Sequence, residues 1–165
     1  MNTKDFLTLL SVSLLWGASF LFLRLLVLDG LEPLQIVSIR MILAALFIAP
    51  FFIRKMKKHS FYDHGFSFLL IGLLNTALPF TMFAYASVSL GAGSLSILQA
   101  TVPILTALIL FTLYKGEFSY FKLSGVMIGF AGLFLLVGPS GNLDLFASIL
   151  CVVASLSYAI AAAIA

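Results

Sequence analysis

The chain alternates between long apolar stretches and short polar segments, and this pattern predicts a series of membrane-spanning helices. A helix needs about 20 apolar residues to cross the hydrocarbon core of a bilayer. Residues 65–114 carry no charged side chain, which is too long for one span, and a cluster of Ser and Gly at 87–93 divides them into two. We therefore predict about six spans, at residues 6–28, 34–53, 66–86, 92–114, 123–138 and 145–165.

The composition agrees with a membrane protein. Of the 165 residues, 62% are hydrophobic and 9% are charged. A soluble domain has about 25% charged residues and cannot bury this much apolar surface in so small a core. We expect an all-α, polytopic membrane helix bundle whose first partner is the lipid bilayer. The single cysteine, Cys151, lies in an apolar run, so it offers neither a disulfide framework nor a metal site.

Basic residues outside the predicted spans are confined to one side of the membrane, and this predicts the orientation. Basic residues fall on one side of the zigzag, at Lys4, residues 54–58, Lys115 and Lys122. The opposite side carries only acidic residues, namely Asp29, Glu32 and Asp144. Because basic loops stay in the cytoplasm, we expect a multi-pass protein of the inner (plasma) membrane with a cytoplasmic amino terminus. The net charge of +3 is then an orientation signal, and we expect no nucleic-acid partner.

Two arginines, Arg24 and Arg40, lie inside predicted spans. A charged side chain at membrane depth costs at least about 2.5 kcal/mol unless it finds partners or a water-filled cavity. Arg24 shares a helix face with Trp16 and Phe20, and it either lines a cavity with them or snorkels to the nearby interface. Arg40 lies deeper, and it either attracts an anionic group or bonds the carbonyls at the end of a neighbouring helix.

The third span contains Pro79, which removes an intrahelical hydrogen bond and predicts a kink. The carbonyl left without its amide partner belongs to Asn75, and Phe80 and Tyr85 follow the proline. Kinks beside polar side chains recur at transport sites because bent backbone can bind polar groups. The same kink can also be satisfied locally, with no substrate involved.

The fourth span has one face of small and polar residues and one apolar face, both at helical spacing. Ser96, Gln99 and Pro103 share the first face, with Pro103 predicting a second kink. Such a face suits either close helix packing or the wall of a cavity. We predict that Gln99 lines a cavity.

Further patterns concern how the spans pack and repeat. In the fifth span, Gly125, Gly129 and Gly132 form a face that predicts helix packing rather than ligand contact. The first and sixth spans both place small residues around one aromatic side chain, Trp16 and Tyr158 respectively. The two spans would enter the membrane from opposite sides. This weak sequence similarity between them therefore favours repeated units of opposite orientation, an architecture common in transporters.

Catalytic chemistry is missing from the predicted spans. None of them contains Asp or Glu, so no buried general acid, general base or proton relay is available. Both histidines lie in the polar segment 54–64, which we expect to be a loop, and no phosphate-binding loop or nucleophile elbow occurs. We expect no enzyme activity, no cofactor and no metal.

Several motifs together resemble the EamA branch of the drug/metabolite transporter superfamily. They are LLWGASF at 14–20, Glu32-Pro33 with Arg40 and Ala44, the long stretch at 84–109, KGE at 115–117 and KLSGVMIGFAGLFLLVG at 122–138. The resemblance implies two inverted five-helix repeats that alternate access to a central cavity. Residues 1–138 would be the first repeat, and 139–165 a linker and the first helix of an incomplete second one. One departure is Phe118, which follows Glu117 where the family commonly has Arg.

The leading hypothesis is a secondary transporter that exports small metabolites, amino acids or drugs. The residues expected to line its path are Trp16, Asn75, Phe80, Tyr85, Ser96, Gln99 and Tyr158. Because the sequence ends in an apolar run, we also expect it to be part of a longer protein or a truncated reading frame. A second copy or a second half would then complete the cavity. The alternative is a non-transporting membrane protein, either a structural or assembly subunit or an inactive fragment.

Overall fold

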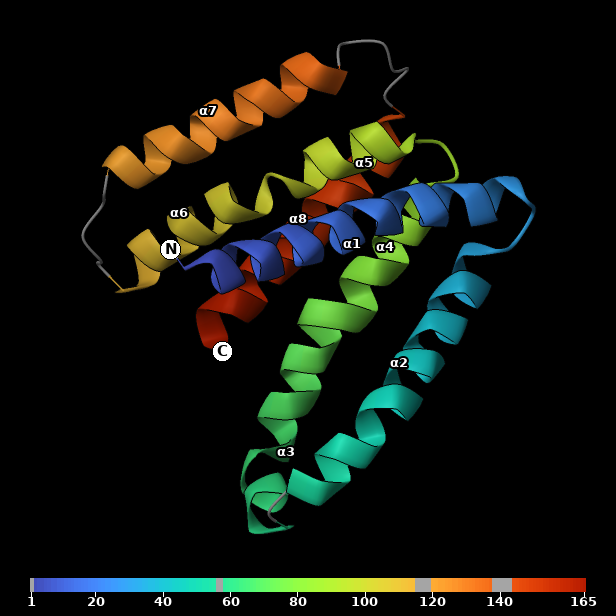
Figure 1. Ribbon diagram of the computed structural model, residues 1–165, viewed down its shortest axis with the longest axis vertical. Helices are drawn as coiled ribbons and strands as arrows, with labels where there is room; N and C mark the ends of the chain where they lie inside the picture. Colours follow the sequence, from blue (N-terminus) through green and yellow to red (C-terminus); the bar gives the residue numbers. More distant parts are fainter. Residues whose placement is uncertain (1, 56–57, 115–119, 138–143) are drawn as a thin grey trace.

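All regular structure in the described part of the chain is helical, as the sequence predicts. The structure, a computed structural model, describes residues 2–55, 58–114, 120–137 and 144–165. Its elements are α1 (Thr3–Leu28), α2 (Pro33–Lys55), α3 (Lys58–Gly72), the π-helical turn η1 (Leu73–Ala77), α4 (Leu78–Ala86), α5 (Ala92–Gln99), α6 (Val102–Tyr114), α7 (Tyr120–Val137) and α8 (Leu145–Ile164) (Figure 1). Within the described ranges, five helical segments are long and apolar enough to cross a membrane. The fold class is therefore a polytopic helix bundle, and α7 occupies the position of the predicted fifth span.

The predicted polar loop at 54–64 is mostly helix, so this detail of the sequence analysis is wrong. Helix α2 continues to Lys55 and α3 begins at Lys58, which leaves only residues 56–57 between them outside the description. Proline and glycine, the residues that most often end helices, are absent from 51–64. Charge alone does not break a helix; it only takes the helix out of the hydrocarbon.

Pro79 is accommodated by a turn of π-helix directly before it. Elements α3, η1 and α4 follow one another without interruption, and the amide of Leu78 bonds the carbonyl of Leu73 in the wider i→i−5 pattern. A single π-turn inside an α-helix is a recognised way to bend it, often at functional positions. The hydroxyl of Thr81 donates to the Ala77 carbonyl at 2.7 Å, which satisfies backbone next to the bend. The irregularity predicted at Pro79 is present.

The predicted span 92–114 is two helices rather than one kinked helix. Helix α5 ends at Gln99 and α6 begins at Val102, so that Pro103 is the second residue of α6. The N–H groups of the first helical residues have no acceptor within the helix, so a proline at that position removes no hydrogen bond. Two hydroxyl groups donate to the carbonyl of Leu98 at the break, that of Thr101 at 2.6 Å and that of Ser155 on α8 at 3.1 Å. The broken backbone is thus held by the neighbouring helix.

Helix α8 lies at the centre of the packed region. It contacts α4, α5, α6 and η1, while α1 contacts α2 and α5, α2 contacts α4, and α7 lies against α5 and α6 (Figure 1). Its buried face repeats at helical spacing and is made mainly of small residues, namely Ala147, Cys151, Ala154, Ser155 and Tyr158. Small side chains let helix backbones approach closely, which is how helices pack in lipid.

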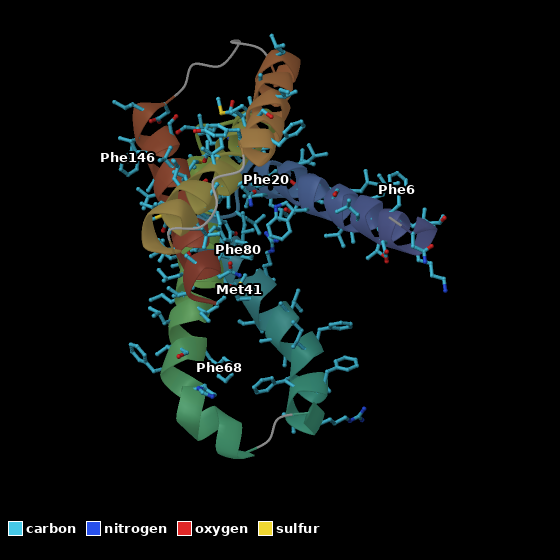
Figure 2. The ribbon with its side chains drawn as sticks, turned by 90° about the vertical axis from the view of Figure 1, so that its left-hand side faces the viewer. Phe6, Phe20, Met41, Phe68, Phe80 and Phe146 are labelled. Carbon is cyan, nitrogen blue, oxygen red and sulfur yellow. The ribbon has the colours of Figure 1, made fainter. Side chains whose placement is uncertain are left out.

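The ends of several helices project away from this centre. Figure 2 shows the amino-terminal half of α1 pointing away from the core in one direction and the neighbouring ends of α2 and α3 in another, with Phe6 and Phe68 distant from the core. Both side chains are 51% exposed. Exposed apolar side chains on helices of membrane length are suited to contact with lipid tails. The first turns of α1 and the last turns of α8 lie on the same side of the molecule, so these two helices run in roughly opposite directions (Figure 1).

Candidate functional site

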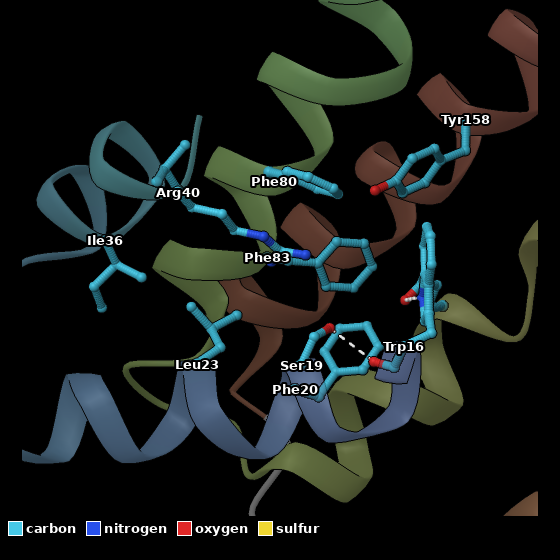
Figure 3. A pocket seen from close by; sticks show the side chains of 11 residues that line it. Trp16, Ser19, Phe20, Leu23, Ile36, Arg40, Phe80, Phe83 and Tyr158 are labelled. Carbon is cyan, nitrogen blue, oxygen red and sulfur yellow. Dashed lines mark hydrogen bonds between the residues drawn. The ribbon is translucent and has the colours of Figure 1, made fainter. Parts of the chain in front are cut away.

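A small cavity lies where α1, α2, α4, α5 and α8 meet, and we call it the central cavity (Figure 3). Its volume is about 30 Å³, which is enough for a water molecule or two but far below the 300–1,000 Å³ of typical ligand pockets. Its walls are mostly aromatic and aliphatic, with a few polar groups between them. The lining residues are Trp16, Ser19, Phe20, Leu23, Ile36, Val37, Arg40, Phe80, Phe83, Gln99 and Tyr158.

One wall of the central cavity is a hydrogen-bonded pair formed by α1 and α5. The indole Nε1–H of Trp16 donates to the amide oxygen of Gln99 at 3.3 Å. Gln99 is the last residue of α5, directly before the break in the fourth span. The pair therefore joins the middle of α1 to the point where the backbone of the fourth span is irregular.

The opposite wall is a row of three side chains from α2, α4 and α8. The guanidinium carbon of Arg40 lies 4.4 Å from the ring centroid of Phe80. The Phe80 ring in turn meets Tyr158 edge to face, with centroids 6.4 Å apart. A guanidinium over an aromatic face is attracted by the negative face of the ring, and this attraction strengthens away from water. Because the Arg40 residue is exposed overall, we expect the cation–π contact to contribute about 0.5–1 kcal/mol, as at other exposed sites.

Two larger grooves flank the central cavity. The α1–α5 groove, of about 480 Å³, shares Trp16, Phe20 and Gln99 with the cavity and continues past Ser96 and Pro103. The α1–α2 groove, of about 520 Å³, shares the cavity residues Ser19, Leu23, Ile36 and Arg40. Each groove is large enough for a metabolite. The small cavity is therefore a constriction between two open spaces, with shared side chains as its walls.

The predicted path residues fall into three groups. Four of the seven, namely Trp16, Phe80, Gln99 and Tyr158, come together with Arg40 in the central cavity, and Ser96 lies in the adjoining α1–α5 groove. The other two, Asn75 in η1 and Tyr85 in α4, are exposed and line neither the cavity nor the grooves. That any of these residues contacts a substrate stays a prediction.

Arg24 makes contacts of a different kind from those of Arg40. Its guanidinium donates to the backbone carbonyls of Ser87 and Val88, the latter at 2.8 Å, just past the carboxyl end of α4. Carbonyls at a helix end lack intrahelical partners and carry partial negative charge. The sequence analysis considered that Arg40 bonds the carbonyls at a helix end; in the structure it is Arg24 that does so. Arg40 donates no hydrogen bond to any described residue.

The glycine face of α7 is not covered by the described part of the chain. A Cβ atom built on Gly125 or Gly132 would meet no heavy atom within 4 Å. The surroundings of Gly129 lie outside what the structure describes. Helix packing through this face therefore stays a prediction.

The sequence analysis missed the apolar side chains that complete the cavity. Phe83 lies one turn after Phe80 on α4, and Ile36 and Val37 lie one turn before Arg40 on α2. Neighbours at i±3 and i±4 share a helix face, so these positions were accessible from the spacing alone. Within the described residues, no group of three or more His, Cys, Asp or Glu side chains is arranged to hold a metal ion.

Comparisons with known proteins agree with a transporter. An uncharacterized transporter of Archaeoglobus fulgidus is 33% identical over 153 residues, which cover 90% of this chain and 50% of that protein. The uncharacterized transporter YoaV of Bacillus subtilis is 27% identical over 164 residues, covering 96% of this chain and 56% of its own length. The chain thus spans about half the length of the curated relatives it matches. No solved structure matches it. The sequence profile of the EamA-like transporter family matches residues 4–138, and the chain belongs to that family.

Proposed function

We propose that this chain forms one side of the substrate path of a secondary transporter that exports small metabolites or drugs across the inner membrane by alternating access. The observation that carries the proposal is the central cavity. Four side chains predicted to line a path meet Arg40 there, so that five different elements contribute, at a constriction between two larger grooves. Membership of a transporter family supports the same activity.

The geometry suggests how the constriction opens in this proposal. A cavity of about 30 Å³ cannot hold a metabolite, so the arrangement corresponds to a closed state. Separating Trp16 from Gln99 joins the cavity to the α1–α5 groove, because both side chains line both spaces. The π-turn before Pro79 and the break before Pro103 supply bends at which α4 and α5 can move without breaking regular hydrogen bonds.

The proposal includes an orientation and a repeat. Basic residues at Lys4 and 54–58 favour a cytoplasmic amino terminus. Residues 1–138 form the first five-helix repeat and 139–165 begin a second one of opposite orientation. A second half or a second copy completes the walls of the path. The roughly opposite directions of α1 and α8 support this part (Figure 1).

A comparison of the two glutamines in the chain tests the proposal. Cells overproducing the full-length gene product are compared with cells carrying Gln99→Ala or Gln35→Ala, and export is followed by mass spectrometry of the medium. Gln99 lines the constriction, whereas Gln35 accepts a hydrogen bond from the Glu32 amide at the start of α2, outside the cavity. We expect the wild type and Gln35→Ala to release a specific set of metabolites and Gln99→Ala to release it at least several-fold more slowly.

Membrane content of each variant is measured in parallel, so that loss of protein is not mistaken for loss of transport. Trp16→Phe is a second variant, because it keeps an aromatic ring and removes only the N–H that bonds Gln99. Equal release by cells with and without the wild-type protein would refute the proposal and favour a non-transporting membrane protein.

A further inference from the structure

We infer that the central cavity, once it has opened by separation of Trp16 from Gln99, selects organic anions, with a carboxylate held by Arg40 and Tyr158 and a flat apolar body held by the surrounding aromatic side chains. The inference rests on the proposed transport function and narrows its substrate class. It starts from two donors that face one cavity and have no acceptor within the described residues.

The first donor is Arg40. A guanidinium carries five N–H donors and no acceptor. Its guanidinium carbon lies 4.4 Å from the centroid of the Phe80 ring, and this contact uses none of the N–H groups as a hydrogen-bond donor to an oxygen. Arg40 has neither a hydrogen bond nor an ion pair with any residue that the structure describes. A guanidinium in this state is suited to a carboxylate, which it binds with two parallel hydrogen bonds.

The second donor is the hydroxyl of Tyr158. This side chain is only 8% exposed, yet its hydroxyl bonds no described residue. Figure 3 shows the hydroxyl directed from α8 toward Phe80 and the interior of the cavity, which Arg40 enters from α2. A hydroxyl at the open end of a mostly buried side chain, aimed into a cavity, is a group that a ligand oxygen can satisfy.

The lining disfavours cations and zwitterions. Among the described residues, no Asp or Glu lines the cavity, so they offer no carboxylate to neutralise an ammonium group. The positive charge of Arg40 repels an ammonium group, and the neutral amide oxygen of Gln99 does not offset that repulsion. Besides this oxygen, the described lining offers the donors of Arg40 and Tyr158 and aromatic faces. An anion with one charged end and an apolar body matches both.

The body of the ligand would lie among aromatic rings. Phe20 and Phe83 meet edge to face with centroids 5.6 Å apart on the wall between Arg40 and Trp16. Stacked and edge-to-face contacts with a flat ligand add to the apolar area that it buries. Arg40 also opens onto the α1–α2 groove, which provides a route by which the charged end arrives.

The test uses Trp16, the only tryptophan of this chain and a lining residue, as the reporter. The full-length protein is placed in phosphatidylcholine nanodiscs, and its tryptophan fluorescence is titrated with benzoate, uncharged benzamide and cationic benzylamine. We expect saturable binding of benzoate at least tenfold tighter than binding of either other probe. Trp16→Phe identifies the part of the signal that comes from the cavity.

Variants locate the selectivity. Arg40→Gln is expected to weaken benzoate binding at least tenfold, since charge-assisted bidentate bonds are the strong class. Tyr158→Phe keeps the ring contact with Phe80 but loses one hydrogen bond to the ligand, so we expect it to weaken benzoate binding about fivefold. The matched control is Arg54→Gln, which removes the same charge from an exposed position near the end of α2 and is expected to leave benzoate binding unchanged.

Three outcomes would overturn the inference: benzamide binding as tightly as benzoate, benzoate not binding, or Arg40→Gln binding benzoate like the wild type. In the last case Arg40 serves another anion, such as a lipid phosphate reached through the α1–α2 groove. None of these outcomes refutes transport itself, because the glutamine comparison measures release of any metabolite. Conversely, unchanged release in that comparison refutes the transport path whatever benzoate does.

Discussion

Replacement of Arg24 by methionine is the sharpest test of how α1 and α4 are held together. Arg24 reaches from near the end of α1 to the carbonyls of Ser87 and Val88, which follow α4. Arg24→Met keeps a long apolar stem that packs in the same space. It removes the donors and leaves the two carbonyls without their charged partner.

The magnitude follows from the two hydrogen bonds. In soluble proteins a bond from a charged donor contributes about 1.5–3 kcal/mol, whereas hydrogen bonds measured inside membrane proteins average about 0.6 kcal/mol. Arg24 is half-buried, so solvent screening reduces what its charge adds to the strength of these hydrogen bonds. We expect Arg24→Met to lower the free energy of unfolding by about 2 kcal/mol, or roughly thirtyfold in the equilibrium constant.

The assay is an SDS titration of the protein in mixed micelles, followed by circular dichroism. Hydrogen exchange provides a local readout, because the amides of Ser89 and Leu90 bond the Ala86 carbonyl in the turn that Arg24 holds. These amides should exchange faster in Arg24→Met. Arg24→Lys, which keeps the charge but not the planar fork, should fall between the two.

Arg54→Met is the control, since Arg54 is exposed near the end of α2. If Arg24→Met unfolds within about 0.5 kcal/mol of the wild type, as an ordinary surface substitution does, the capping argument fails. The same conclusion follows if both arginine variants lose equal stability.

Two other substitutions test how α8 is fixed. Ser157→Ala removes a hydroxyl that donates to the Leu74 carbonyl in the π-turn at 2.7 Å, and we expect the same titration to show a loss of about 1 kcal/mol. Asp144 caps the start of α8, and its pKa is lowered, first by the Ala147 amide and then by the Ser89 hydroxyl. Because the folded pKa lies below the unfolded one, the stabilisation is present above about pH 4 and is lost as the pH falls through the folded pKa. The free energy of unfolding, measured as a function of pH, should therefore show this decrease at acid pH in the wild type and not in Asp144→Ala.

Both tests have matched controls. Ser11→Ala removes a hydroxyl that bonds only within its own exposed helix, to the Leu7 carbonyl, and should change stability less than Ser157→Ala. Asp144→Asn keeps a capping oxygen without a titrating charge, so it should remain stable at acid pH relative to the wild type. A wild-type profile identical to that of Asp144→Asn would show that the carboxylate does not stabilise α8.

The sequence by itself determined the membrane class, the approximate spans and the irregular points of the backbone. Hydrocarbon excludes charge and unpaired backbone groups, so long uncharged stretches have little choice other than helix. Proline likewise acts locally, which is why Pro79 and Pro103 were recognisable as irregular points. The same local logic predicted face sharing within one helix, such as Trp16 with Phe20.

Only the tertiary structure decided which faces meet. The two arginines have the same chemistry and similar surroundings in sequence, yet Arg24 bonds carbonyls and Arg40 lies over Phe80. That difference depends on which helix lies opposite each arginine. The spacing of residues along one helix does not tell which other helix its faces will contact. The break after Gln99 is another case, because the Leu98 carbonyl there accepts a bond from Ser155 of α8. Contacts between residues far apart in sequence come from packing of whole helices, and the central cavity consists almost entirely of such contacts.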